Sequence, residues 1–462
     1  MSFELRKEHL SYTSKKTSRY LRQRFGYLDL YLIGFCILGD KLLNINLLVY
    51  CLGIYLAFRI LFISSNYAFA ILISLIPNLA VMFIPIPSMS VPIINVLMGV
   101  ALFKVCISNF KNPVNKSFLF VIGLFIAYEW SHIFYYDIKS IILLFSWSFA
   151  ILYVSLYFFY SLKTYNHKVV IIYFITGVFI SIIYGVLDFL EKYGTLMTNN
   201  ATIRFKGGAG DPNYFSMYIM ISLFLLLFLV NRETKKLLKF IYPLVFVLFV
   251  AFGVLSLSRM FLLVISLLLM LLLIKIIFKM KKNKKILFFI ISVISILFLF
   301  SIFFIADFTS IINVLLSRFT DFIGDPSALT SNRNVLAEQY LQLLMSDTKD
   351  MIFGIGIQDY HLRSGIQLQA HNIILELLVV WGIVGFLVFI LFVATLLKYG
   401  NTNRKDVKND FISWLPIICM GISYLSLNAM SNESFFLLLL FAMKNLQEFD
   451  SLENYLMKND YG

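Results

Sequence analysis

Residues 372–396 read NIILELLVVWGIVGFLVFILFVATL, and this stretch holds a single charged residue, Glu376. A run of about 20 apolar residues is long enough to cross the hydrocarbon core of a membrane as an α-helix. Similar runs recur along the whole chain, in which 60% of the 462 residues are hydrophobic and only 14% are charged. Because the runs are continuous, they favour helices over the alternating pattern of a transmembrane β-barrel. The sequence therefore predicts an all-α, polytopic membrane protein.

We predict about 14 transmembrane helices in one membrane domain over residues 1–462, with both termini in the cytoplasm. Short apolar runs make the first and last of these helices the least well defined. The predicted ranges are 27–39, 42–63, 67–86, 90–110, 117–136, 140–162, 169–190, 213–230, 239–255, 260–278, 286–308, 372–396, 411–428 and 434–449.

The basic residues are distributed unevenly between the two predicted sides. Of the 39 Lys and Arg residues, 29 lie in cytoplasmic segments or at the adjoining helix ends, as the positive-inside rule predicts. The net charge of +14 is therefore a signal of topology and does not indicate nucleic-acid binding. The ten external residues are Lys41, Lys139, Lys192, Arg204, Lys206, Arg259, Arg318, Arg333, Lys349 and Arg363.

The cysteines and the N-terminus exclude several classes of protein. All four cysteines, Cys36, Cys51, Cys106 and Cys419, lie in apolar runs, which argues against a disulfide framework and against a zinc site. Residues 1–25 are polar and basic, so we expect no cleavable signal peptide.

Two predicted external loops, 191–212 and 309–371, are the longest polar stretches between the apolar runs. Long loops in compact proteins are usually functional. Within the second loop, residues 332–344 place apolar side chains at helical spacing. We predict an amphipathic helix there, capped by Ser331 and lying on the membrane surface.

The first loop ends in the sequence RFKGGAGDPN at residues 204–213, directly before an apolar helix. Asp211 suits the N-cap of that helix and Pro212 suits its first turn. Backbone amides at a helix start bind anions, and Arg204 and Lys206 add full charges, so this is a candidate anion site. The glycines allow close approach of the backbone, but no Gly-Lys-Ser/Thr sequence marks a nucleotide-binding loop. The alternative is a flexible turn with ordinary interfacial charges.

Two further arginines are predicted at helix starts. Arg259 follows Ser258 at the external end of an apolar helix, where a charge is expensive and often functional. It can also extend into the lipid headgroups. Arg333 heads the amphipathic helix of the second loop, and its alternative role is that of a solvated loop residue.

The end of the second loop carries the candidate general base. His371 opens an apolar helix, where the helix dipole favours a neutral imidazole that accepts a proton from a sugar hydroxyl. The alternative is a histidine that only caps the helix, and Glu376 lies one turn below Asn372 rather than below His371. The sequence shows no Ser-His-Asp or Cys-His grouping, and its external carboxylates are too scattered to predict a metal site.

The order of these motifs resembles the O-antigen polymerase and ligase superfamily of Wzy- and WaaL-like membrane glycosyltransferases. The resemblance covers about residues 200–390. The residues that carry it are Arg204, Gly207, Pro212, Asn213, Ser258, Arg259, Ser331, Arg333, Gly354, Gly356, His371, Asn372, Glu376, Gly382 and Gly385. One departure is Leu336, where an aromatic residue is usual.

The resemblance implies a glycosyltransferase that uses undecaprenyl-diphosphate-linked glycans without a cofactor or metal. By this resemblance Arg204, Arg259 and Arg333 would bind the diphosphate, and His371 would be the general base on the acceptor hydroxyl. Preorganised guanidinium groups stabilise charge that develops on a leaving diphosphate. The supporting candidates are Lys206, Asn213, Ser258, Asn372 and Glu376.

We expect a polymerase that joins lipid-linked repeat units of a capsule, exopolysaccharide or O-antigen at the outer face of a bacterial cytoplasmic membrane. A ligase of the same superfamily, which transfers the glycan to another acceptor, is the first alternative. The second is a flippase, although transporters concentrate polar groups near the bilayer midplane and often show two related halves. The implied partners are lipid-linked oligosaccharides, membrane lipids, a chain-length regulator and a flippase, with no nucleic acid.

Overall fold

A computed structural model describes most of the chain. The described residues are 27–44, 46–86, 89–112, 114–135, 138–160, 167–195, 203–266, 333–357, 364–366, 368–400, 411–428 and 434–443. Predicted helix 286–308 and residues 309–332 of the second predicted loop, which include the expected cap Ser331, lie outside these residues.

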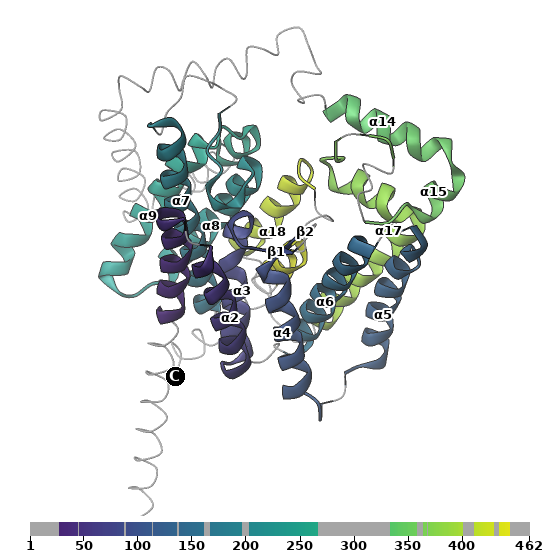
Figure 1. The fold of residues 1–462 in the computed structure, drawn as a ribbon, viewed down its shortest axis with the longest axis horizontal. Coiled ribbons are helices and arrows are strands. Elements are labelled where there is room, and N and C mark those ends of the chain that lie inside the picture. Colours follow the sequence, from purple (N-terminus) through teal and green to yellow (C-terminus); the bar gives the residue numbers. More distant parts are fainter. Residues whose placement is uncertain are drawn as a thin grey trace, which may run out of the picture.

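The described residues are almost all helical (Figure 1). Unlabelled helices cover 27–43, 259–266 and 434–443. The labelled elements are α2 (Leu47–Phe62), α3 (Ser65–Leu75), η1 (Ile76–Val81), β1 (Phe83–Ile86), β2 (Met89–Pro92), α4 (Ile93–Ser108), α5 (Lys116–Trp130), η2 (Ile133–Tyr135), α6 (Ile138–Tyr160), α7 (His167–Tyr193), η4 (Gly207–Ala209), α8 (Pro212–Arg232), α9 (Lys236–Leu255), α14 (Arg333–Ser346), α15 (Thr348–Phe353), α17 (Ile373–Gly400) and α18 (Phe411–Tyr424).

Four of the described helices are long and apolar enough to cross a membrane: His167–Tyr193, Pro212–Val230, Lys236–Leu255 and Ile373–Tyr399. Shorter apolar helices such as α2 and α4 pack against each other and against α3. Many apolar side chains on the bundle surface are exposed, as expected for a surface that faces lipid. The chain is therefore a membrane protein, whereas the number of 14 spans and the cytoplasmic termini stay predictions.

The expectation of an all-α fold and of a helix over 67–86 is wrong at one place. After η1 the chain forms an antiparallel hairpin, in which Phe83 of β1 pairs with Pro92 of β2. The sequence between Met82 and Ile93 contains three prolines, at positions 85, 87 and 92. Proline removes a backbone donor and blocks a helix interior, so a helix cannot continue through this segment.

Polar contacts between helices agree with the predicted alternation of helix direction. Arg59 of α2 donates to Asp29 at 2.9 Å, and both residues were placed at the cytoplasmic side. At the other end, Lys41 donates to Asp188 of α7 at 2.8 Å, and both were placed at the external side. We call the end of the bundle that carries Lys41 and Asp188 the outer end.

Helix α17 is broken inside its length, at Gly382, where the backbone has φ 60° and ψ −170°. The carbonyls before the break accept bonds from outside the helix: Ile355 N–H donates to Val379 at 3.0 Å and Gly356 N–H to Val380 at 2.8 Å. A membrane helix tolerates a break only where other groups satisfy its backbone. The amides of the Gly-Ile-Gly segment at 354–356 therefore replace hydrogen bonds that the broken helix cannot make itself.

Helix α5 completes this junction from the N-terminal half of the chain. The Tyr128 hydroxyl donates to the carbonyls of Phe353 and Trp381, each at 2.7 Å. The fully buried Glu129 carboxylate accepts from the Trp381 indole N–H at 2.5 Å and from the Ile357 amide at 3.0 Å. Figure 1 shows α14 lying crosswise at this end, above α17.

The substitution Gly354→Ala tests this junction. The φ of Gly354 is +76°, and an added Cβ would lie 2.3 Å from the Val380 carbonyl oxygen. Gly365 is a matched control, since its φ is +74° but no atom lies within 4 Å of the added Cβ. Alanine carries backbone strain of about 1–3 kcal/mol at a positive φ, and at Gly354 the ψ of −179° lies in a region that is essentially restricted to glycine. We expect only Gly354→Ala to add a clash and so to lower the melting temperature further, as measured by thermal size-exclusion chromatography. Equal melting of the two variants would contradict the close docking of residues 354–356 on α17.

Candidate active site at the outer end

Helix α8 begins as predicted, with Asp211 as its N-cap and Pro212 in its first turn. One carboxylate oxygen of Asp211 accepts from the amides of Asn213 at 2.7 Å and Tyr214 at 3.1 Å. These two amides belong to the helix start where the sequence predicts an anion site. Because Asp211 already occupies them, anion binding at this end depends on side-chain cations rather than on the α8 amides.

The glycines of the first loop serve close packing within the protein. Gly207 and Gly208 are buried, and the Gly208 amide donates to the Ser181 hydroxyl of α7 at 2.9 Å. A Cβ added to Gly208 would lie 2.6 Å from the side-chain oxygen of Asn78. At Gly210, where φ is +79°, it would lie 2.5 Å from Ala80. The predicted approach of this backbone to a ligand is thus an approach to α7 and η1, which fixes the loop.

Arg204 is held at this fixed loop by two contacts. Its Nε donates to the carbonyl of Ser256 at 3.0 Å, and one terminal nitrogen donates to Asn213 Oδ1 at 2.9 Å. The Ser258 hydroxyl donates to the same Asn213 oxygen at 3.3 Å. The structure therefore brings together Arg204, Asn213 and Ser258, which the sequence places in separate motifs. Arg259 is half-buried at the start of helix 259–266, directly after Ser258.

Arg333 is the first residue of α14, in agreement with the predicted amphipathic helix over 332–344. One face of α14 buries Leu336, Tyr340 and Leu344, which are spaced four residues apart. The Tyr340 hydroxyl donates to the Leu368 carbonyl at 2.7 Å. Helix α14 thus holds both Arg333 and the segment that leads into His371.

His371 precedes the helix and does not cap it, so the expectation that it opens the helix needs correction. Its φ is +48°, in the left-handed region. The N-cap of α17 is Asn372, whose side-chain oxygen accepts from the amides of Ile374 at 3.0 Å and Leu375 at 3.2 Å. The imidazole is therefore not needed for capping, which removes the alternative interpretation of this residue.

Three charged or titratable side chains interact at the centre of the site. Burial lowers the pKa of His371 below its usual value of 6.5, the Arg333 cation lowers it further, and Asp211 opposes both. Burial also lowers the pKa of Arg333, and the negative charge of Asp211 acts in the opposite direction by raising it. Arginine stays charged at neutral pH despite such a shift. The arrangement keeps His371 neutral beside a cation, which suits proton acceptance.

Asn428, which the sequence analysis did not single out, links these parts. Its side-chain oxygen accepts from the His371 amide at 2.9 Å, and its side-chain nitrogen contacts the Gln369 side chain. Its carbonyl accepts from the hydroxyl of Tyr214, in the first turn of α8. The available signal was a polar residue at the outer end of an apolar run, a position that is functional by default in membrane proteins.

The remaining candidates lie around this centre. Glu376 is fully buried one turn into α17, near Tyr340 and Tyr424, and its amide bonds to the Asn372 carbonyl. Lys206 is exposed and lines a pocket beside Arg204. Among the described residues, no three His, Cys, Asp or Glu side chains are placed to hold a metal ion.

The assembled site offers cations for an anionic ligand and a neutral imidazole for a proton. Arg204 and Arg333 come from segments more than a hundred positions apart. Both lie near the start of α8, Arg204 through Asn213 and Arg333 through Asp211. A low-dielectric surrounding strengthens attraction between such guanidinium groups and an anion. The site can therefore bind an anionic group while His371 accepts a proton from a neighbouring hydroxyl.

Comparison with known proteins points to one family. Residues 244–390 match the family model described as O-antigen ligase, Wzy_C. No curated protein and no solved structure matches the chain. The matched range contains Arg259, Arg333 and His371. The match supports the resemblance drawn from the sequence motifs: residues 244–390 are similar to the O-antigen ligase family, which points to the O-antigen polymerase and ligase superfamily.

Proposed function

We propose that this protein is a polysaccharide polymerase that joins undecaprenyl-diphosphate-linked oligosaccharide repeat units at the outer face of a bacterial cytoplasmic membrane. The observation that supports the proposal best is that His371 is half-buried, with Arg333 and Asp211 near enough to influence its pKa in opposite directions. A neutral base next to fixed cations suits transfer of a glycan from a diphosphate to a hydroxyl.

In the proposed reaction, His371 accepts the proton of an acceptor sugar hydroxyl. The hydroxyl oxygen then forms a bond to the anomeric carbon of the donor glycan, and the bond from that carbon to the diphosphate oxygen breaks. The electron pair leaves on the diphosphate, whose growing charge is stabilised by Arg204, Arg259 and Arg333. Arginine suits this task because its planar fork donates two parallel hydrogen bonds to phosphate oxygens.

The supporting residues have positioning roles in this proposal. Asn213 receives bonds from Arg204 and Ser258, so it fixes the guanidinium relative to the start of α8. Asn372 caps the helix that follows the base, and Glu376 lies buried one turn below it. Lys206 adds a positive charge at the solvent side of Arg204.

A ligase is the second candidate because the matching family model is described as O-antigen ligase. The two activities differ in the acceptor. Purified protein in lipid nanodiscs, supplied only with lipid-linked repeat units, should yield a ladder of lengthening glycans on a gel if it is a polymerase. Products that form only after a different acceptor is added would identify a ligase. Substrate that stays unjoined with every acceptor would contradict both proposals and favour a transporter.

The His371→Asn variant removes the base with little structural change. Asparagine tolerates the left-handed region in which His371 lies, and the cap at Asn372 is retained. General-base catalysis typically contributes about 10²–10⁴-fold, so we expect glycan joining to slow by that factor. The melting temperature and the binding of lipid-linked substrate should stay unchanged. Near wild-type rates would exclude His371 as the general base.

The pH dependence of kcat/KM tests the surroundings of His371. Because the base acts in its neutral form, the rate should rise with pH through its pKa, which burial and Arg333 hold below the usual value. Arg333→Gln removes a cation and should move this acidic limb to higher pH. Asp211→Asn keeps an N-cap residue, removes an anion and should move the limb to lower pH.

The control for these shifts is Lys349→Gln, which removes an exposed external cation from α15 and should leave the limb in place. An acidic limb at the same pH in the wild type and all three variants would contradict the electrostatic influence of Arg333 and Asp211 on the pKa of the base.

A further inference from the structure

A pocket lies beside the candidate site, where the outer end of α7 faces the first loop. Its lining includes Asp188, Phe189, Lys192, Tyr193, Arg204 and Lys206. Two further lining residues, Gly185 and Gly207, pack so closely that a Cβ on Gly185 would lie 2.6 Å from the Gly207 Cα. This approach fixes the loop cations against α7.

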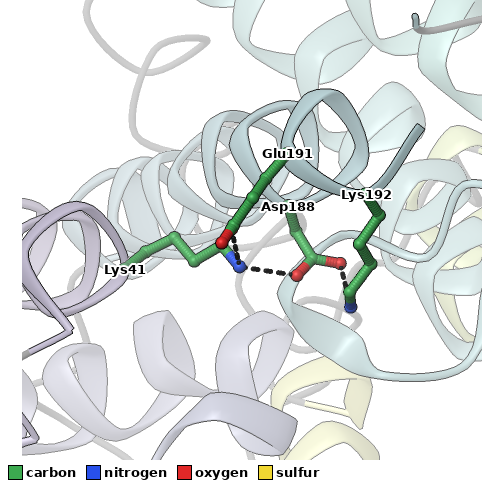
Figure 2. A network of polar contacts seen from close by, with 4 residues as sticks. All are labelled: Lys41, Asp188, Glu191 and Lys192. Atoms are coloured by element: carbon green, nitrogen blue, oxygen red, sulfur yellow. Dashed lines mark hydrogen bonds and ion pairs between the residues drawn. The ribbon is translucent and has the colours of Figure 1, made fainter. Parts of the chain in front are cut away.

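A network of four charged side chains joins the pocket to the first described helix, 27–43 (Figure 2). One oxygen of Asp188 pairs with Lys41 at 2.8 Å and the other pairs with Lys192 at 2.8 Å. Lys41 also pairs with Glu191 at 2.6 Å. The two lysines and two carboxylates balance one another.

The pocket therefore has an excess of positive charge. Arg204 and Lys206 add two cations to a network that is already neutral. Lys192 keeps half of its side-chain surface exposed, so its ammonium group can also bind a ligand. Asp188 holds Lys192 in position, but it also pairs with Lys41. Its single negative charge is therefore divided between two lysines and does not neutralise Lys192 completely.

Arg204 connects the pocket with the centre of the site. Its guanidinium lines the pocket and also bonds to Asn213, at the start of α8. The ring of Tyr193, which is partly exposed, lies 4.7 Å from that of Phe189 and provides an aromatic surface in the same wall. Such a combination of cations and an aromatic ring fits an anionic group attached to a sugar.

We propose that this pocket binds an anionic group of the lipid-linked glycan, with Lys192 and Lys206 as its ligands and Asp188 and Lys41 as positioning residues. The proposal rests on the proposed function for the nature of the substrate. Two parts of such a substrate carry this chemistry: the diphosphate of the carrier and an acidic sugar of the repeat unit.

Lysine acylation followed by mass spectrometry tests the pocket without requiring turnover. The full chain in phosphatidylcholine nanodiscs is treated with an amine-reactive ester, with or without inorganic diphosphate or sodium glucuronate at matched ionic strength. A probe at about twice its Kd occupies two thirds of the sites, so acylation of Lys192 and Lys206 should slow about threefold. Lys349, an exposed external lysine of α15, is the internal control and should react unchanged.

The two probes distinguish the sources of the anion. Protection by diphosphate alone assigns the pocket to the carrier, and protection by glucuronate alone assigns it to an acidic sugar. Lys192→Gln should weaken the protection of Lys206, whereas Lys349→Gln should not. The proposal is overturned if neither probe slows Lys192 more than Lys349. A chain that shows protection but forms no ladder would instead contradict the proposed function alone.

Discussion

The architecture depends on how a broken membrane helix satisfies its backbone. Gly382 interrupts α17, and in hydrocarbon an unpaired carbonyl costs several kcal/mol. The segment 354–356 and the Tyr128 hydroxyl supply donors to the carbonyls of Val379, Val380 and Trp381. The glycines at 354 and 382 follow from this requirement, because each has positive φ and leaves no room for a Cβ. The break thereby anchors the end of the long loop close to the start of α17, where His371 lies.

At the outer end, single carboxylates serve two purposes each. Asp211 caps α8 with its carboxylate and also faces Arg333 and His371. A single anion thus stabilises a helix start and limits the repulsion between two neighbouring basic groups. At α7, Asp188 has a similar double role, since it pairs with a lysine on each side. In both places a carboxylate holds cations in position yet leaves the region positive, which favours an anionic ligand.

The sequence predicted most helices because hydrophobic length is a strong signal when the solvent is lipid. It also predicted the N-cap at Asp211 and the helix headed by Arg333, since both follow local rules. The β-hairpin at 83–92 was missed because hydrophobic length outweighed the proline signal. The role of Asn372 as the cap was missed because His371 was expected to open the helix and Asn372 to be its first residue, and a left-handed φ cannot be recognised from a histidine in the sequence. Asn428 was placed at the end of predicted helix 411–428, but its role could not be predicted because its contacts join residues more than fifty positions away.

The family match and the candidate site cover different parts of the chain. Residues 244–390 include Arg259, Arg333 and His371, but Arg204, Asp211 and Asn428 lie outside this range. These outside residues hold the guanidinium at α8, balance Arg333 and bond the His371 amide. The matched domain also needs α5, because Glu129 and Tyr128 secure the break in α17. Motifs for the proposed chemistry can therefore concentrate in one third of the chain while their positions depend on the hydrophobic helices around them, whose sequences carry no motif.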